Sequence, residues 1–326
     1  MPSLSVQAER WPLAAPFVIA RGAKTDAWVV VAELLDGAHR GRGEAVPYAR
    51  YDETVESVLA QIRSVGSHIE SGAGRAQLQA LLPAGSARNA LDCALWDLEA
   101  KRCGVRAWRL AGRDRLDPVK TCFTISLGSP EEMAAAARAN ARRPMLKLKI
   151  GGSDDLAAVA AVRSAAPRAR LVVDANEALN LQDLHRLAPE FASLGVQLIE
   201  QPLPAADDGA LADYAGSTPL CADESVRTRA DLARSVGRYQ VVNIKLDKAG
   251  GLTEGLALAE EARRLGFGLM VGSMVATSLG VAPAMILAQG AEFVDLDGPL
   301  LMASDRKPSL AGPGSLLMPP ERDLWG

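Results

Sequence analysis

The sequence predicts an α/β protein in which an eight-stranded parallel barrel follows a small α+β domain. After residue 117, short apolar segments alternate with amphipathic helical stretches, with one strand-helix unit every ~25 residues. Eight such segments favour a closed barrel over an open sheet. The 326 residues are 48% apolar and 23% charged, the balance of an ordinary globular protein that has room for two domains.

Residues 1–117 are expected to form an α+β capping domain. Residues 27–35 and 39–46 are strand-like and are separated by Asp36-Gly37, a typical hairpin turn. Two helical stretches follow, over 53–70 and 86–102, in which apolar residues recur at helical spacing. Strands followed by helices indicate a compact domain of mixed class.

Residues 118–298 are expected to form a modified TIM barrel of the (β/α)7β type. The eight strand candidates are 120–127, 145–150, 170–176, 196–203, 220–225, 241–248, 268–274 and 293–298. Seven helices are expected between them. A doubly wound open sheet is the alternative, but it would favour a glycine-rich phosphate turn after the first strand, which residues 127–131 lack. The Pro- and Gly-rich residues 299–326 are expected to pack back on the capping domain.

Composition argues against several classes of partner. The formal net charge of −3 gives no reason to expect nucleic acid or an anionic membrane as a partner. The sequence has no evident signal peptide and no run of the ~20 apolar residues that span a bilayer. Four cysteines without CxxC spacing and only three histidines give poor support for disulfides or zinc. We therefore expect a cytoplasmic protein with a small-molecule substrate, and the oligomeric state, a homo-oligomer included, stays open.

Ionisable residues stand at the carboxyl ends of the expected strands, where a barrel interior would otherwise be apolar. Alternate side chains of a strand share a face. If the apolar residues of 145–150 pack outward, Lys147 and Lys149 point into the barrel. The same reasoning gives further inward or strand-end polar residues: Asp174, Glu200, Asp223, Asn243, Lys245, Asp247, Asp295 and Asp297. Unpaired buried charges are costly, so their convergence indicates an active site at this end of the barrel.

Three acids on adjacent strands suggest a metal site. Asp174, Glu200 and Asp223 supply only hard oxygen ligands, which suit Mg²⁺ and disfavour zinc. The alternative is that the acids are neutralised only by the neighbouring lysines, in which case Mg²⁺ would bind weakly.

Two lysines complete the expected chemistry. Lys149 on the second barrel strand and Lys245 on the sixth lie across an eight-stranded barrel, with the acids between them. A nearby cation and a second lysine would lower the pKa of each amine toward that of a usable base. Two bases on opposite faces of one carbon can remove a proton from one side and return it on the other, which is racemisation or epimerisation.

With these motifs the sequence resembles the enolase superfamily, in its muconate-lactonising subgroup, over essentially the whole chain. The motifs are Lys147-Leu-Lys149, Asp174-Ala-Asn, Glu200-Gln-Pro, Asp223-Glu-Ser and Lys245-Leu-Asp-Lys, with residues 87–98 in the cap. Within the subgroup it is similar to the dipeptide epimerases that act on L-Ala-D/L-Glu, through Asp295-Leu-Asp297-Gly-Pro and residues 16–22.

The resemblance implies one Mg²⁺ per subunit and a set of substrate contacts. Lys147 would hold the substrate carboxylate, Asp295 and Asp297 the α-ammonium group, and Arg21 of a mobile loop the glutamate side chain. Thr124 and Ser273 would contact the dipeptide backbone. Weaker implications are a lid role for Glu44 and Tyr48, and support of the bases by Asp247 and Lys248.

Three hypotheses follow. The first is proton transfer at the α-carbon of the C-terminal residue of L-Ala-D/L-Glu through an enediolate, in the degradation of murein peptides. The second is another reaction of the subgroup: o-succinylbenzoate synthesis, N-acylamino-acid racemisation or cycloisomerisation. The third is a non-catalytic metal-binding or interaction protein that kept the barrel.

Overall fold

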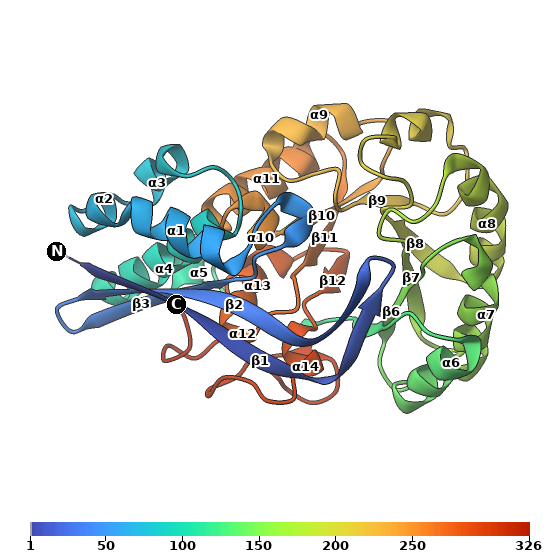
Figure 1. The fold of residues 1–326 in the computed structure, drawn as a ribbon, viewed down its shortest axis with the longest axis horizontal. Coiled ribbons are helices and arrows are strands. Elements are labelled where there is room, and N and C mark those ends of the chain that lie inside the picture. The colour runs from blue at the N-terminus through green and yellow to red at the C-terminus, as the bar shows by residue number, and fades with distance from the viewer. Residues whose placement is uncertain (1) are drawn as a thin grey trace.

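The computed structural model describes residues 2–326 as a barrel with a cap at one side (Figure 1). The barrel sheet runs in the order β12-β11-β10-β9-β8-β7-β6-β5, with neighbouring strands parallel, and a separate three-stranded antiparallel sheet belongs to the cap. Backbone contacts also join the two ends of the sheet, since Cys122 N donates to Val294 O at 2.8 Å. The barrel is therefore nearly closed.

The cap combines the antiparallel sheet with helices, the last of which is the short α5 (Ala107–Leu110). Its elements are β1 (Ser3–Ile19), β2 (Gly22–Asp36), β3 (His39–Ala45), α1 (Val55–Ser64), α2 (Gly66–Glu70), α3 (Arg75–Leu81) and α4 (Ser86–Cys103). The sheet lies directly on α4, because a Cβ added at Gly43 would come within 2.1 Å of Ala90 O. The helix ends at Gly104, whose φ of 68° is typical of a helix C-terminus.

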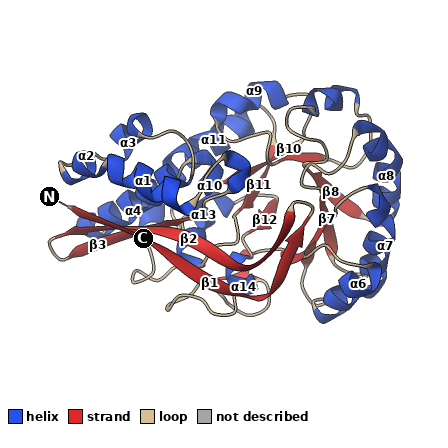
Figure 2. Ribbon diagram, in the orientation of Figure 1, coloured by secondary structure: helices blue, strands red, loops and turns tan. Residues whose placement is uncertain are grey.

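The barrel strands are short. They are β5 (Phe123–Ile125), β6 (Met145–Lys149), β7 (Arg170–Asp174), β8 (Val196–Glu200), β9 (Leu220–Ala222), β10 (Val241–Lys245), β11 (Gly268–Gly272) and β12 (Phe293–Asp295). Helices cover the outer face of the strands (Figure 2). The helices and short helical turns after β5 are α6 (Pro130–Ala139), α7 (Leu156–Ala165), α8 (Leu181–Ser193), α9 (Leu232–Ser235), α10 (Leu246–Ala249), α11 (Leu252–Arg264), α12 (Ser278–Val281), α13 (Ala284–Ala288) and α14 (Gly298–Leu301).

A packed layer closes the barrel interior below the site. One buried apolar residue or cysteine comes from each strand or from the position just before it: Cys122, Met145, Val172, Leu198, Cys221, Val241, Met270 and Phe293. The polar residues two and four positions further along the same strands therefore lie above this layer. This places the site at the carboxyl ends of the strands.

Two local features differ from the sequence-based expectation. A 3₁₀ helix, Asp208–Asp213, connects β8 to β9 in place of one of the seven expected α-helices. Pro204, Pro219 and two glycines in this connection disfavour a longer helix. The N-terminal residues form a long strand, β1, which pairs with β2 up to Ile19 opposite Gly22. The expected loop at residues 16–22 is thus the end of a hairpin, whose tip extends over the barrel (Figure 1).

The C-terminal residues pack on the cap. Trp325 is 1% exposed, and its indole N–H donates to Cys93 O of α4 at 3.0 Å. Nearer the barrel, β13 (Leu316–Leu317) pairs with β4 (Val119–Lys120). None of the helices formed by residues 2–326 has the length and apolar character needed to cross a membrane.

Candidate active site

A cavity at the carboxyl ends of the barrel strands collects most of the polar residues singled out from the sequence. The tip of the β1–β2 hairpin lies over it. The lining includes Arg21, Lys24, Tyr48, Thr124, Lys147, Lys149, Asn176, Asp223, Glu224, Lys245, Ser273, Asp295 and Asp297. Asp174 and Glu200, both 0% exposed, contact the lysines of this lining. The structure therefore brings the predicted metal ligands, base lysines and substrate-binding residues together at this cavity.

Strand register aligns the acids and one of the lysines. Lys149 at the end of β6 pairs with Asp174 of β7, which pairs with Glu200 of β8. Lys149 Nζ lies 2.6 Å from Asp174 Oδ2. Lys245 ends β10, three strands further from Asp174, and its Nζ lies 2.7 Å from Asp223 Oδ2. The two amines thus enter the cavity from strands on different sides of the carboxylates.

Lys147 connects three acids. Its Nζ lies 3.0 Å from Asp174 Oδ2, 2.7 Å from Glu200 Oε2 and 2.6 Å from Asp295 Oδ2. Burial alone would lower the pKa of Lys147, but these carboxylates raise it well above its usual value. It is therefore a fixed positive charge at the centre of the site.

The three expected metal ligands fit a hard divalent cation. They offer carboxylate oxygens only, and burial together with the charge of Asp174 raises the pKa of Glu200 to about 7. Glu200 Oε2 and Asp223 Oδ1 accept no hydrogen bond of good geometry among the described residues, although lysine ammonium groups lie within ion-pair distance of both. These two carboxylate oxygens therefore have lone pairs that no hydrogen bond uses, and they could coordinate an Mg²⁺ ion.

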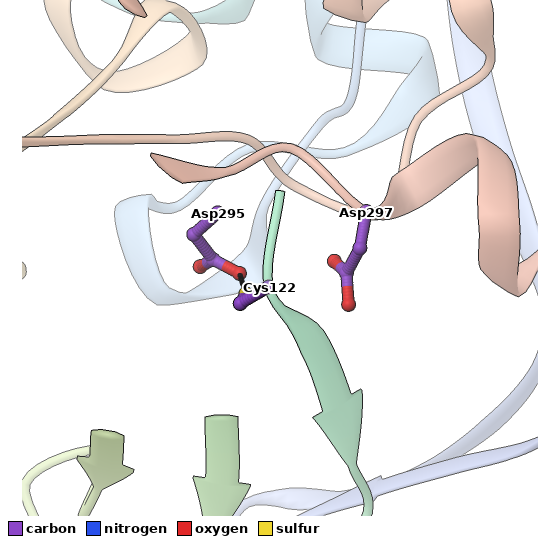
Figure 3. A group of neighbouring side chains, drawn as sticks. All are labelled: Cys122, Asp295 and Asp297. Carbon is purple, nitrogen blue, oxygen red and sulfur yellow. Dashed lines mark hydrogen bonds between the residues drawn. The ribbon is translucent and has the colours of Figure 1, made fainter. Parts of the chain in front are cut away.

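Asp295 and Asp297 form a second acidic group, with Cys122 beside them (Figure 3). The Cys122 thiol donates to Asp295 Oδ1 at 2.9 Å, and Thr124 N donates to Asp297 Oδ2 at 2.6 Å. Burial and the neighbouring Asp295 raise the pKa of Asp297 to about 6. Asp295 is already paired with Lys147, so Asp297 is the carboxylate of this pair that faces the cavity without a lysine partner.

The pKa of Lys245 differs from the sequence-based expectation of a lowered value. Burial would lower the pKa of Lys245, but Asp223 raises it well above the usual range. The cause is that the Asp223 carboxylate contacts the Lys245 ammonium group directly. A divalent cation held by the same carboxylate would oppose this effect, because it cancels the negative charge that stabilises the ammonium form.

The two residues after Leu246 have separate roles. Lys248 is 1% exposed; its Nζ lies 2.6 Å from Asp223 Oδ1 and donates to the carbonyls of Asp223, Val226 and Asn243. It therefore anchors the end of β9. Asp247 instead accepts hydrogen bonds from Val46 N at 3.0 Å and the Asn89 side chain, which ties the barrel to the cap.

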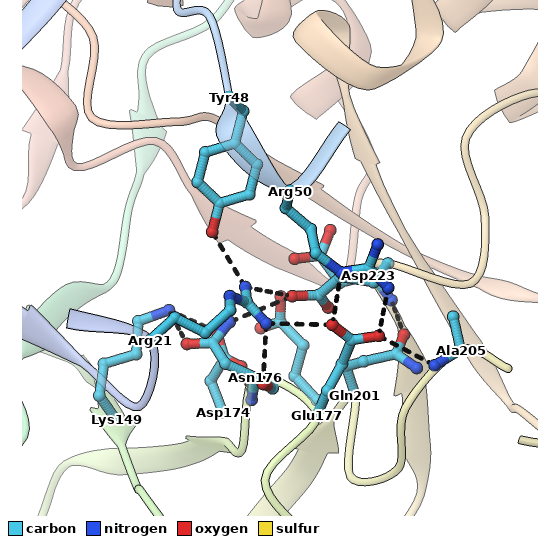
Figure 4. Close-up of polar contacts among 12 residues, drawn as sticks. Arg21, Tyr48, Arg50, Lys149, Asp174, Asn176, Glu177, Gln201, Ala205 and Asp223 are labelled. Atoms are coloured by element: carbon cyan, nitrogen blue, oxygen red, sulfur yellow. Dashed lines mark hydrogen bonds and ion pairs between the residues drawn. The ribbon is translucent and has the colours of Figure 1, made fainter. Parts of the chain in front are cut away.

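Arg21 is held by protein groups at the tip of the hairpin (Figure 4). Its NH1 donates to Asn176 O at 2.8 Å, and its NH2 donates to Tyr48 OH at 2.9 Å and to Glu224 Oε1 at 2.7 Å. An ion pair with Glu177 completes the set. The guanidinium group that the resemblance assigns to a substrate side chain thus already has four protein partners, although it also lines the cavity.

Lys24 is a cavity residue that the sequence reasoning missed. It lies on β2, and no residue among 2–326 forms an ion pair or hydrogen bond with it. Burial, with the positive charges of Lys149 and Lys245, lowers its pKa. The only signal in the sequence is its position three residues after Arg21. Because the strand predicted from the sequence begins at residue 27, the direction of the Lys24 side chain cannot be inferred from it.

Ser273 and Glu44 differ in how their positions compare with their predicted roles. Ser273 Oγ is buried, lines the cavity and has no hydrogen-bond partner among the described residues, as expected of a ligand-binding hydroxyl. Glu44, in contrast, does not line the cavity. It is 1% exposed and accepts hydrogen bonds from Thr277 N at 2.8 Å and from Arg306 at 2.6 Å. The suggested lid role of Glu44 is replaced by a structural one.

Comparison with known proteins gives matches over most of the chain. The N-terminal domain model of the mandelate racemase / muconate lactonizing enzyme family matches residues 1–112, and an enolase C-terminal domain-like model matches residues 131–299. The L-Ala-D/L-Glu epimerase of Escherichia coli (strain K12) is 47% identical over 312 residues, 95% of this chain and 97% of that protein. An N-acetyl-D-glutamate racemase of a Pseudoalteromonas species is 42% identical over 301 residues, 91% of this chain and 95% of that one.

The structure is also similar to solved ones. One is an enolase family member from Agrobacterium tumefaciens with homology to dipeptide epimerases, solved with bound sodium, L-Ala-L-Glu and an ordered loop. It is 49% identical, with a TM-score of 0.98 over 100% of both chains.

Proposed function

Because the chain belongs to the mandelate racemase / muconate lactonizing enzyme family of the enolase superfamily and is an Mg²⁺-dependent isomerase, we propose that its substrates are L-Ala-L-Glu and L-Ala-D-Glu. The reaction is epimerisation at the glutamate α-carbon. The observation that carries the proposal is the placement of Lys149 and Lys245 on β6 and β10, with buried carboxylates on the strands between them.

The chain's residues divide the reaction between two amines. Lys149 or Lys245 takes the α-proton from one face, and the other lysine, as its ammonium form, returns a proton to the opposite face. Lys147 holds the substrate carboxylate, whose charge increases as the enediolate forms. Asp174, Glu200 and Asp223 would hold Mg²⁺, which neutralises part of that charge when bound. The hairpin covers the cavity and excludes water.

The direct test is deuterium exchange at the glutamate α-carbon. Incubation of either dipeptide with the enzyme and Mg²⁺ in D₂O should give α-deuteration and the other epimer. Exchange is expected to stop when Mg²⁺ is chelated and to return when it is added back. A dipeptide that shows no exchange in the presence of Mg²⁺ would refute the proposal.

A second candidate substrate is an N-acylated glutamate, because one relative is an N-acetyl-D-glutamate racemase. The two candidates differ in the α-ammonium group, which only the dipeptide carries. Asp297 has no lysine partner and can pair with that group, whereas an N-acyl substrate offers it no cation. We therefore favour the dipeptide.

Asp297→Asn should discriminate between these substrates. We expect kcat/KM for L-Ala-L-Glu to fall roughly 10- to 150-fold, because a charged hydrogen bond contributes about 1.5–3 kcal/mol. The fold should survive, since an asparagine oxygen can still accept from Thr124 N. N-acetylglutamate in the same variant is the control, with little change expected. Equal losses for both substrates would argue against an ammonium-binding role.

Lys24, rather than Arg21, is the cation we assign to the glutamate side chain. Its ammonium group has no hydrogen-bond or ion-pair partner among residues 2–326, while the Arg21 guanidinium has several. Lys24→Met should lower kcat/KM for L-Ala-L-Glu by roughly 10- to 150-fold through loss of one charge-assisted hydrogen bond. L-Ala-L-Gln, which has a neutral side chain of the same shape, serves as the control and should be little affected. Similar losses with both dipeptides would contradict the assignment.

The proposed reaction fits the degradation of murein peptides in the cytoplasm. The reaction involves only small molecules and requires no nucleic acid or membrane partner. The net charge of −3 likewise gives no reason to expect such a partner.

A further inference from the structure

We propose that Arg21 is a positioning residue for Lys149, one of the two bases. Docking of the hairpin on the loop after β7 fixes the conformation of Asn176, and Asn176 in turn fixes the orientation of the Lys149 side chain. The inference rests on the proposed function, because it concerns the two-base reaction. It follows from the contacts that Arg21 makes in place of a substrate contact.

Arg21 holds Asn176 in two ways. NH1 donates to Asn176 O at 2.8 Å. NH2 donates to Glu224 Oε1 at 2.7 Å, and the same oxygen accepts from Asn176 Nδ2 at 3.5 Å. Glu224 is 5% exposed, so this pairing occurs away from bulk water. One guanidinium group therefore fixes both the backbone and the side-chain amide of Asn176 (Figure 4).

Asn176 and its neighbour adopt a conformation that needs such support. Asn176 has a φ of 44° and Glu177 a φ of 71°, in the left-handed region that residues other than glycine rarely occupy. Asparagine tolerates this region, but glutamate does so only when its surroundings fix it. Arg21 and Arg50 both pair with Glu177, and Glu177 Oε1 also accepts from Ala205 N at 2.9 Å. The hairpin tip and cap thus supply part of this support.

Asn176 in turn contacts the base on β6. Its Oδ1 accepts from Lys149 Nζ at 3.1 Å, and its backbone N donates to Asp174 Oδ1 at 2.9 Å. The hairpin also lies near Lys149 itself, since Lys149 Nζ lies 5.9 Å from the centroid of the Phe17 ring. The orientation of Lys149 therefore depends on the closed hairpin through two routes.

The other base lacks this dependence. Lys245 Nζ donates to Asp223 Oδ2 at 2.7 Å, and within residues 2–326 it makes no hydrogen bond or ion pair to the hairpin or to Asn176. Loss of Arg21 should consequently impair proton transfer at the Lys149 face more than at the Lys245 face. A residue that only bound substrate, or only closed the site, would slow both faces alike.

The experiment compares the two faces directly. Initial α-deuteration rates are measured separately for L-Ala-L-Glu and L-Ala-D-Glu, and Lys149→Ala identifies which epimer depends on Lys149. In Arg21→Met, we expect exchange of the Lys149-dependent epimer to fall at least about tenfold further than exchange of the other. Arg21→Lys, which can keep one of the contacts, should restore part of the difference.

The matched control is Arg50→Gln, which removes an ion pair to the same Glu177 without touching Asn176. It should slow both epimers equally, by less than about threefold. Equal slowing of both epimers in Arg21→Met would overturn the proposal.

A crystal structure of Arg21→Met provides a readout that needs no turnover. We expect loss of the bond between Lys149 Nζ and Asn176 Oδ1 and a change in the Asn176 backbone. A retained bond with φ still positive would refute the inference. If the wild-type enzyme exchanged neither dipeptide, the proposed function would fail, and this structural readout would still decide the role of Arg21.

Discussion

Removing either base lysine is expected to reduce epimerisation of L-Ala-L-Glu by about a thousandfold, because general acid-base catalysis contributes 10²–10⁴-fold. Lys149→Ala and Lys245→Ala should differ, however, in which epimer still exchanges its α-proton for deuterium. Each variant keeps the lysine that serves one epimer, so it should deuterate that epimer without inverting it.

The two exchange patterns should be complementary. NMR of the α-proton in D₂O, with each epimer supplied separately, gives the four rates that are needed. Lys120→Ala, on the exposed position of β4, is the control for loss of a lysine elsewhere. If one variant lost exchange of both epimers while the other lost neither, a single-base mechanism would replace the one proposed here.

The second large effect is expected from Glu200→Gln. The change keeps the shape of the side chain, and the Gln oxygen can still accept from Asn243 Nδ2, which lies 2.8 Å from Glu200 Oε1. It removes one charged ligand of the three, so Mg²⁺ affinity should fall by about 100-fold or more. Catalytic activity should fall with it, since the charge of the enediolate is no longer balanced.

Glu200→Gln should not destabilise the metal-free protein, although it weakens Mg²⁺ binding and activity. The folded pKa of Glu200 is about 7, above the value of an unfolded chain. As pH rises from about 4.5 to 7, the unfolded state loses this proton first, so the free energy of unfolding of the wild type declines over that window. Glutamine cannot ionise. Metal-free Glu200→Gln should therefore be at least as stable as the wild type at pH 8.

Thermal unfolding with EDTA and with saturating Mg²⁺ checks both parts. The wild type should gain about 2.7 kcal/mol of stability from Mg²⁺ at a concentration 100 times its Kd, and the variant should gain only about 0.4 kcal/mol or less at the same concentration. Glu190→Gln, an exposed change on α8, is the control. An unchanged Mg²⁺ response in Glu200→Gln would remove Glu200 from the metal site.

The barrel and its charged residues could be predicted from the sequence because their signals are local and periodic. The alternation in residues 145–149 is enough to turn Lys147 and Lys149 inward above Met145, once the strand is recognised. The α-helix predicted between β8 and β9 was wrong. Proline and glycine in residues 204–219 disfavour a helix there, although the average strand-helix spacing favoured one.

The hairpin contacts could not be inferred in this way. Arg21 meets Asn176 and Glu224 at separations of 155 and 203 residues, and no local pattern encodes such pairs. The orientation of the Lys24 side chain depends on the register of β1 against β2. Lys24 pairs with Phe17, and the register shifts between Pro12 and Phe17. A sequence pattern gives the direction of a side chain only where the strand is regular.

Glu44 joins three segments that lie far apart in the chain: β3 of the cap, Thr277 after β11, and Arg306 near the C-terminus. Its carboxylate is buried and pairs with Arg306, so loss of the Arg306 segment alone would leave a buried charge without its ion-pair partner, at a cost of several kcal/mol. Partial unfolding of the cap alone is correspondingly disfavoured. We therefore expect the cap and the barrel to unfold together in one cooperative transition.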